Sequence, residues 1–256
     1  MTMISTQFHR SRLAAVTALA AVVAAAWLYL LAGAGLGLAP MMAPSMKAGG
    51  GAAAPGSCTL AHTALVFGMW TAMMAAMMLP SAIPVIDRIA QRARRPALAL
   101  SFGAGYLLIW MVFSLAASFL QRELAARGLL SQAMALRSKQ VASVVLIAIG
   151  VYQLGPVKQA CLTRCRALAA LVPGDARPTA TTMLAMGLRY GLYCAGCCAL
   201  MMGLLLVVGV MNAVWIAMLT LWVLAEKTLP SGGDLARVAG LGLIGWGTLS
   251  LAPPLL

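Results

Sequence analysis

Long apolar runs separated by short polar segments dominate this chain. A helix that crosses a bilayer needs about 20 mostly apolar residues, and stretches of that kind recur from the N-terminal region to the C-terminus. The pattern predicts an all-α fold, a polytopic transmembrane helix bundle of about seven spans that forms one integral membrane domain over residues 1–256. The expected spans cover residues 13–39, 63–83, 97–120, 134–154, 190–208, 211–229 and 235–251.

Composition excludes the usual soluble classes. Hydrophobic residues make up 62% of the chain and charged residues only 9%, against about 25% charged in soluble domains. A soluble enzyme, a disordered tail and a secreted disulfide scaffold are all excluded. We expect no nucleic-acid partner, because membrane topology accounts for the excess of 18 Lys and Arg over 5 Asp and Glu.

Basic residues gather in cytoplasmic loops of membrane proteins. A cytoplasmic N-terminus puts 13 of the 18 cations on the inside, so we predict that orientation. The first apolar stretch is longer than the core of a signal peptide, and we expect a retained anchor. Residues 155–189 are expected to form a basic loop, and the spans 190–208 and 211–229 a tight antiparallel hairpin.

Sulfur is the second compositional oddity, with 18 Met and 6 Cys. Five of the methionines lie in the second span, in adjacent stripes along one half of the helix: Met69, Met73, Met74, Met77 and Met78. Methionine is also a flexible apolar filler, so packing and soft-metal binding both remain open. We expect Pro80 and Pro84 to break this helix. The outer loop adds Met41, Met42 and Met46.

Cysteines form two clusters. At about 100° per residue, Cys194, Cys197, Cys198 and Met201 share one arc of about 100° on the fifth span. Cys161 and Cys165 are four residues apart, so their sulfurs would face the same way on a helical turn. Lys158, Arg164 and Arg166 surround this pair, and nearby cations favour the thiolate that binds metal. Ordinary interfacial cysteines are the alternative.

Glu226 is the acidic residue expected at membrane depth. Intramembrane carboxylates are costly and usually functional, and the tight hairpin would return Glu226 to the neighbourhood of Cys194 and Cys197. The alternative is that Glu226 and Lys227 merely end the helix at the interface. On the same face we expect a stripe that includes Trp215, Met218 and Trp222.

Together these residues predict a soft-metal site. Thiolates and thioethers select Cu(I), and four thiolates suit Zn(II). Cys161, Cys165, Cys194 and Cys197 could form a four-thiolate zinc site, but the methionine stripe favours copper. The candidate metal ligands are Met73, Met77, Met78, Cys161, Cys165, Cys194, Cys197, Cys198, Met201 and Glu226.

The order and spacing of these motifs resemble a known family. The matching runs begin at Met69-Trp70, Tyr152-Gln153-Leu154, Cys161, Gly191, Gly209 and Glu226-Lys227 and extend over about residues 67–230. They are similar to those of the DUF2182 family of bacterial multi-pass membrane proteins described as metal-binding. The resemblance implies a multi-pass protein of the bacterial inner (cytoplasmic) membrane that binds a metal.

Three functions are compatible with these patterns. The first is a membrane protein that handles or transfers Cu(I) through Cys and Met ligands, with a periplasmic or cytoplasmic metal carrier as its partner besides the lipid bilayer. The second is a thiol–disulfide or electron-transfer protein that uses the paired cysteines. The third is a structural subunit of a membrane complex. The sequence contains no P-loop, which argues against a primary pump, and we assign no catalytic residue.

Overall fold

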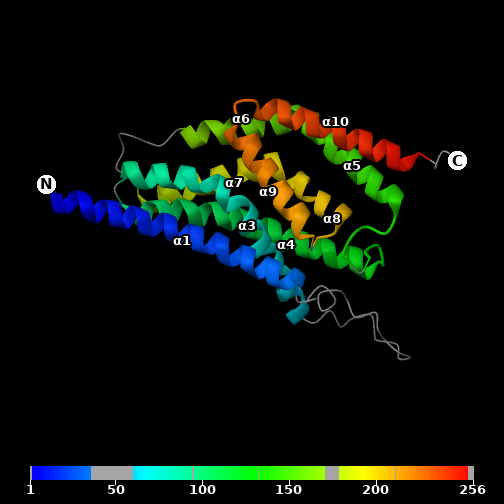
Figure 1. Ribbon diagram of the computed structural model, residues 1–256, viewed down its shortest axis with the longest axis horizontal. Helices are drawn as coiled ribbons and strands as arrows, with labels where there is room; N and C mark the ends of the chain where they lie inside the picture. The colour runs from blue at the N-terminus through cyan, green and yellow to red at the C-terminus, as the bar shows by residue number, and fades with distance from the viewer. Residues whose placement is uncertain are drawn as a thin grey trace.

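The computed structural model describes residues 2–35, 60–93, 95–131, 133–170, 179–210 and 212–252, and the regular elements in these ranges are helices (Figure 1). The all-α prediction is confirmed. The helices are α1 (Thr2–Gly35), α3 (Leu60–Ala93), α4 (Pro96–Ala126), α5 (Lys139–Leu154), α6 (Pro156–Ala170), α7 (Ala180–Met202), α8 (Leu204–Val208), α9 (Ala213–Thr228) and α10 (Gly232–Leu251).

Several of these helices are compatible with a membrane. Within the described ranges, three segments are long and apolar enough to cross a bilayer: Thr63–Gln91, Ala97–Ala126 and Ala180–Val208. A fourth exists if Lys139–Leu154 and Pro156–Leu168, which meet at a bend of 57°, form one broken span. The expectation of about seven spans is therefore supported in part. The apolar section of α1, Val16–Ala32, is shorter, and residues 36–39 of the first predicted span lie outside the described residues.

Helix replaces the loop that was expected over much of residues 155–189. Pro156 begins α6 directly after α5, because proline is well suited to the first turn of a helix. Helix α7 begins at Ala180 rather than near residue 190, and the side chain of its N-cap, Thr179, accepts a hydrogen bond from the Thr182 amide. Capping of this kind allows a polar segment to start a long apolar helix.

The expected break in the second span is wrong. Pro80 and Pro84 both lie inside the 34-residue helix α3. Proline is tolerated in membrane helices where neighbouring groups satisfy the nearby backbone. The prolines leave the carbonyls of Ala76 and Pro80 without their intrahelical donors. Next to them, the hydroxyls of Ser81 and Tyr106 both donate to the Met78 carbonyl, at 2.8 and 3.1 Å, and the second bond ties α3 to α4.

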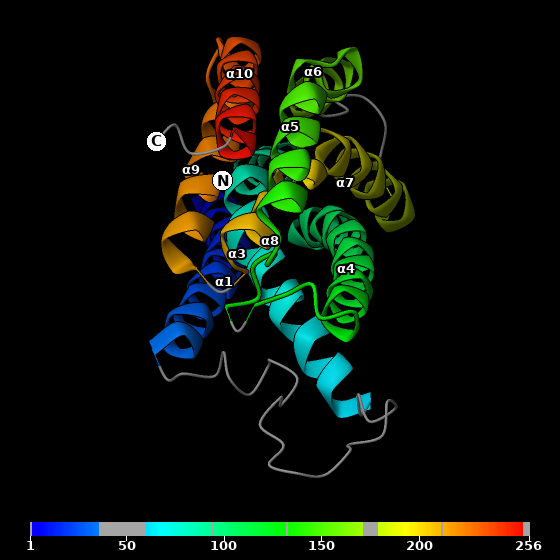
Figure 2. The ribbon, with the colours of Figure 1, turned by 90° about the vertical axis from the view of Figure 1, so that its right-hand side faces the viewer.

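Helix α3 lies at the centre of the bundle. It packs against α1 and α4, α4 packs in turn against α7, α5 pairs with α10, and α6 lies beside α7 (Figures 1 and 2). Glycines permit two of these close crossings. A Cβ atom at Gly187 of α7 would collide with the Phe102 carbonyl of α4, and one at Gly150 of α5 would lie 2.7 Å from the Gly240 carbonyl of α10.

The chain reverses direction between α7 and α9, as expected for a hairpin, but the two helices do not pack tightly against each other. Gly209, at φ 102°, turns the chain after α8, and α9 then packs more extensively on α3 than on α7. Its C-terminal end nevertheless comes back to the cysteines of α7, through Lys227. The central helix α3 thus separates much of α7 from α9 and contributes to the space between them.

Candidate metal centre

The cysteines of α7 face the interior, as their helical spacing predicted. Cys194, Cys197, Cys198 and Met201 are each at most 4% exposed. The sulfur atoms of Cys197 and Cys198 lie 3.2 Å apart, and the Cys197 thiol also donates to the Cys194 carbonyl one turn earlier. One face of α7 therefore presents adjacent thiols without contact with solvent.

Helix α6 adds a fourth buried thiol. Cys165 is 1% exposed, and its side chain interacts with those of Cys194 and Cys197. We refer to Cys165, Cys194, Cys197 and Cys198 as the buried thiol cluster. The five cysteines in the described ranges carry free thiols. The structure thus groups one member of the first predicted pair with all three cysteines of α7.

Cys161 lies at the margin of this cluster. It is half-buried, and its sulfur rests against Gly196, where an added Cβ would lie 2.8 Å from it. The Tyr152 hydroxyl donates to the carbonyl of the same glycine. The expected set of four thiols included Cys161. In the structure Cys198 takes its place as the fourth thiol of the cluster.

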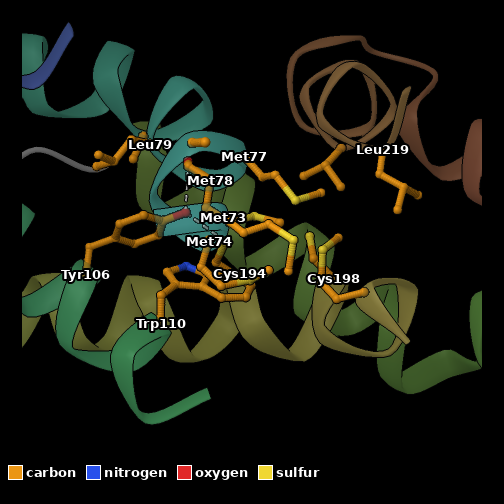
Figure 3. Close-up of a cluster of buried hydrophobic side chains, with 14 of the residues drawn as sticks. Met73, Met74, Met77, Met78, Leu79, Tyr106, Trp110, Cys194, Cys198 and Leu219 are labelled. Carbon is orange, nitrogen blue, oxygen red and sulfur yellow. Dashed lines mark hydrogen bonds between the residues drawn. The ribbon is translucent and has the colours of Figure 1, made fainter. Parts of the chain in front are cut away.

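The methionine stripe of α3 faces the same interior. Met69, Met73, Met74, Met77 and Met78 are each at most 1% exposed. In Figure 3 the sulfur atoms of Met73 and Met77 point into the space beside Cys198, with Leu219 of α9 on its far side. Thioethers from α3 and thiols from α7 therefore share one dry interior space.

Lys227 contacts a thiol of the cluster directly. Its Nζ lies 2.8 Å from the Cys194 sulfur and 3.0 Å from the Ser81 hydroxyl, and the Tyr106 hydroxyl lies 3.2 Å from the same sulfur. The sequence pattern offered Lys227 only as a residue that could end the helix together with Glu226, and it did not predict this contact. A lysine that directly follows a buried carboxylate in an apolar helix is the signal that could have found it.

Glu226 is buried, but its partners are not the cysteines. Its Oε2 accepts from Lys158 Nζ at 2.7 Å and its Oε1 from Trp222 Nε1 at 2.9 Å. The Lys158 side chain is 0% exposed and that of Glu226 is 1% exposed. This ion pair ties the start of α6 to the end of α9 beside the cluster, and both oxygens of the carboxylate are engaged.

The cations near Cys161 and Cys165 are directed elsewhere. Arg164 donates to the Tyr193 hydroxyl at 3.2 Å, and Arg166 donates to the Leu229 carbonyl at 2.7 Å. Lys158 is held by Glu226. The cation that the structure places on a thiol is Lys227, from a helix distant in sequence.

Other predicted sulfur positions differ in their surroundings. Met201 accepts a hydrogen bond on its sulfur from Gln153, at 3.2 Å. Met218 is 52% exposed, and Trp215 stacks on Trp246, so these two members of the expected stripe on α9 do not line the centre. Met41, Met42 and Met46 lie outside the described residues.

The thiols lie near one another without a finished coordination shell. Among the described residues, no group of three or more His, Cys, Asp or Glu side chains is arranged to hold a metal ion. A preformed four-thiolate geometry of the kind that zinc adopts is therefore absent from this part of the chain. Cu(I) accepts low coordination numbers, and the closely spaced thiols with neighbouring thioethers offer the soft donors it prefers.

Comparison with known proteins identifies the group to which the chain is related. A family model described as PpoB2, copper chaperone, matches residues 67–250. No curated protein and no solved structure matches. The matched range contains the buried thiol cluster, the methionines of α3 and the Lys158–Glu226 pair. The chain belongs to the PpoB2 copper chaperone family.

Proposed function

We propose that the chain is an integral membrane copper chaperone that holds Cu(I) at the buried thiol cluster. The observation that carries this proposal is the meeting of thiols from α6 and α7 with thioethers from α3 in one solvent-free space. Sulfur donors of both kinds select Cu(I) over harder ions. Membership of a copper chaperone family supports the same metal.

Copper is favoured over zinc by the make-up of the space. The soft donors that α3 and α7 present to this space are thioethers and thiols, and the nearby carboxylate of Glu226 is already engaged by Lys158 and Trp222. Zinc sites use Cys and His, and Asp or Glu as well, but not thioethers. The thioethers of Met73 and Met77 are therefore suitable ligands for Cu(I) but not for zinc.

Lys227 gives the thiol cluster a counter-charge. A thiolate in an apolar interior is costly unless a cation is close to it, and Lys227 Nζ lies 2.8 Å from the Cys194 sulfur. We assign Cys194 as the first thiolate to bind the metal. The hydroxyls of Ser81 and Tyr106 complete the polar surroundings of this corner.

The two kinds of sulfur give the transfer a direction. Thioethers are neutral and bind Cu(I) more weakly than thiolates, so copper that reaches the methionines of α3 moves downhill to the cysteines. This exchange needs no nucleotide. The Met-rich outer loop would be the first contact for copper from outside, and a periplasmic or cytoplasmic metal carrier would be the partner.

We place the protein in the bacterial inner membrane with the N-terminus in the cytoplasm and α1, α3, α4, α5, α7, α9 and α10 as its seven spans. The distribution of 13 of the 18 cations on one side supports this orientation. The N-terminal end of α1 and the C-terminal end of α10 lie at opposite ends of the bundle, which fits an odd number of crossings (Figure 1).

Metal analysis of the purified protein tests the proposal. The full-length chain in detergent is loaded with Cu(I) under reducing, anaerobic conditions, desalted and analysed for copper and zinc. The double variant Cys194→Ser, Cys197→Ser is compared with Cys58→Ser, which serves as the matched cysteine control. We expect the unmodified chain and the control to retain copper and the double variant to lose it.

Two results would overturn this proposal. One is an unmodified chain that retains no copper after desalting, and the other is a double variant that retains as much copper as the control. The thiol–disulfide alternative makes a different prediction. It requires a reversible loss of free thiols under a mild oxidant in metal-free protein, with no dependence on copper.

A further inference from the structure

Cys161 differs from the other cysteines of the site in its access to the outside. Of the five cysteines in the described ranges, Cys161 alone is half-buried, while the other four are buried. It precedes Cys165 by four residues on α6, so the two lie on the same face of that helix. About 6 Å along the helix axis separates them. The face of α6 therefore leads from a buried thiol to an accessible one.

The neighbouring helix is shaped to receive this thiol. Gly196 of α7 lies between Cys194 and Cys197, and a Cβ there would lie 2.8 Å from the Cys161 sulfur. The absence of a side chain at Gly196 thus lets the sulfur rest against the backbone of α7. The Tyr152 hydroxyl bonds to the Gly196 carbonyl on the same side. Cys161 is consequently held next to the helix that carries three thiols of the buried cluster.

Two exposed arginines lie around a tyrosine on this surface. Arg164 lies over the Tyr193 ring at 5.8 Å and donates to its hydroxyl. Arg189 is exposed, and its side chain also interacts with Tyr193. Helices α6 and α7 lie side by side at the periphery of the molecule (Figure 2). The approach to Cys161 is therefore positively charged, which favours a negatively charged partner.

We infer that Cys161 is the exchange thiol through which the buried cluster passes Cu(I) to an anionic thiol acceptor. This inference rests on the proposed function, because it assigns the exit of the same site. The acceptor chemistry is a thiol that carries net negative charge, whether on a small molecule or on an acidic metal-carrier protein.

The transfer is a ligand exchange without oxidation or reduction. A Cu(I)–sulfur bond to Cys161 forms as the bond to Cys165 breaks, and the Cys161 proton passes to the released Cys165 thiolate. The acceptor sulfur then binds the ion as the bonds to Cys194 and Cys161 break, which leaves Cys194 as the thiolate beside Lys227. Copper stays Cu(I) throughout. The proton that leaves the acceptor thiol is taken up by the released Cys161 thiolate, so atoms and charge balance.

A release assay separates this exit from the binding site. Full-length protein in detergent is loaded with Cu(I), mixed with an excess of glutathione, an anionic thiol, or cysteamine, a cationic thiol, and desalted at intervals. The copper that remains on the protein is measured. The variants are Cys161→Ser and Arg164→Gln, with Arg237→Gln, an exposed cation elsewhere on the surface, as the charge control.

Cys161→Ser is expected to load as much copper as the unmodified chain but to release it to glutathione about tenfold more slowly or worse, because exchange depends on an accessible attacking thiol. Arg164→Gln should slow release to glutathione by about two- to fivefold and leave release to cysteamine unchanged. An acidic metal-carrier protein added in place of glutathione should show the same dependence on Cys161.

The outcomes distinguish the two proposals. Loss of copper binding by the unmodified chain contradicts the proposed function. Normal loading with equally fast release from Cys161→Ser contradicts only the exit. As a second measurement, brief maleimide treatment of copper-loaded Cys58→Ser protein should modify Cys161 first and slow release to the same extent. Modification of Cys161 without slower release would also refute the inference.

Discussion

The buried pair Lys158–Glu226 allows a quantitative prediction. The Lys158 Nζ and the Glu226 Oε2 lie 2.7 Å apart, with the two side chains 0% and 1% exposed, and Trp222 supplies the other hydrogen bond to the carboxylate. Replacement of Lys158 by Met keeps the apolar length of the side chain but removes its charge. The carboxylate of Glu226 then remains in the interior with a single donor.

The expected cost follows from the burial of both charges. Removal of one partner of a buried ion pair typically costs about 3–5 kcal/mol, because the remaining charge is neither solvated nor paired. For a domain of this size a loss of that magnitude lowers the unfolding temperature by roughly 6–20 °C. The double variant Lys158→Met, Glu226→Gln leaves no charge at these two positions and retains an oxygen for Trp222. It should return to within about 1–2 kcal/mol of the unmodified protein.

Thermal unfolding of the metal-free protein in detergent measures all four members of this double-mutant cycle. The exposed pair Arg237–Asp234, whose side chains are 65% and 72% exposed, provides the control, because loss of such a pair has little effect on stability. The reasoning is refuted if Lys158→Met lowers the free energy of unfolding by less than about 1 kcal/mol, or if the double variant is no more stable than Lys158→Met.

Two further predictions concern packing and metal binding. Gly187→Ala should lower the free energy of unfolding by about 1–3 kcal/mol, because its methyl group would collide with the backbone of α4 at Phe102. Gly242→Ala, which meets nothing within 4 Å, should be neutral or stabilising in the same unfolding assay, and equal effects at the two glycines would contradict the described crossing. Met73→Leu should lower Cu(I) affinity about tenfold in competition with a chromophoric chelator. Met218→Leu, at an exposed methionine, should not, and an unchanged affinity of Met73→Leu would remove α3 from the site.

Helical periodicity explains why the α7 face could be predicted. Cys194, Cys197, Cys198 and Met201 share an arc on any regular helix, and the structure buries all four. The methionines of α3 follow the same logic. In both segments the sequence alone determines which residues lie together, since they belong to one uninterrupted helix.

The position of α6 could not be predicted in this way. Whether Cys161 or Cys165 meets the cysteines of α7 depends on the 57° bend after Leu154 and on the glycine at position 196. The burial of Lys158 depends on the same bend, which directs a cation that was expected beside Cys161 and Cys165 toward Glu226. Local sequence favours a helix at Pro156 but does not specify its angle.

The contact of Lys227 with Cys194 could not be predicted for a different reason. An adjacent Glu–Lys pair near the end of an apolar helix is typical of an interface, and hydropathy gives no reason to place either side chain inside. The structure gives Glu226 to Lys158 and Lys227 to Cys194. Both contacts join segments far apart in the chain, so only the packing of α9 on the bundle could reveal them.

Because the sulfur atoms are buried, the affinity of the site for an ion and the rate at which the ion exchanges are set by different features. Side chains of the buried thiol cluster and of Met73 and Met77 are at most 1% exposed, so an ion among them is shielded from water and oxidants. Its residence time is then set by how often neighbouring side chains swing aside rather than by bond strength alone. Methionine has an unbranched, flexible side chain, and rotamer changes are far faster than the collective shifts of helices. A closed bundle lined with methionine can therefore store a reactive ion and still exchange it without opening.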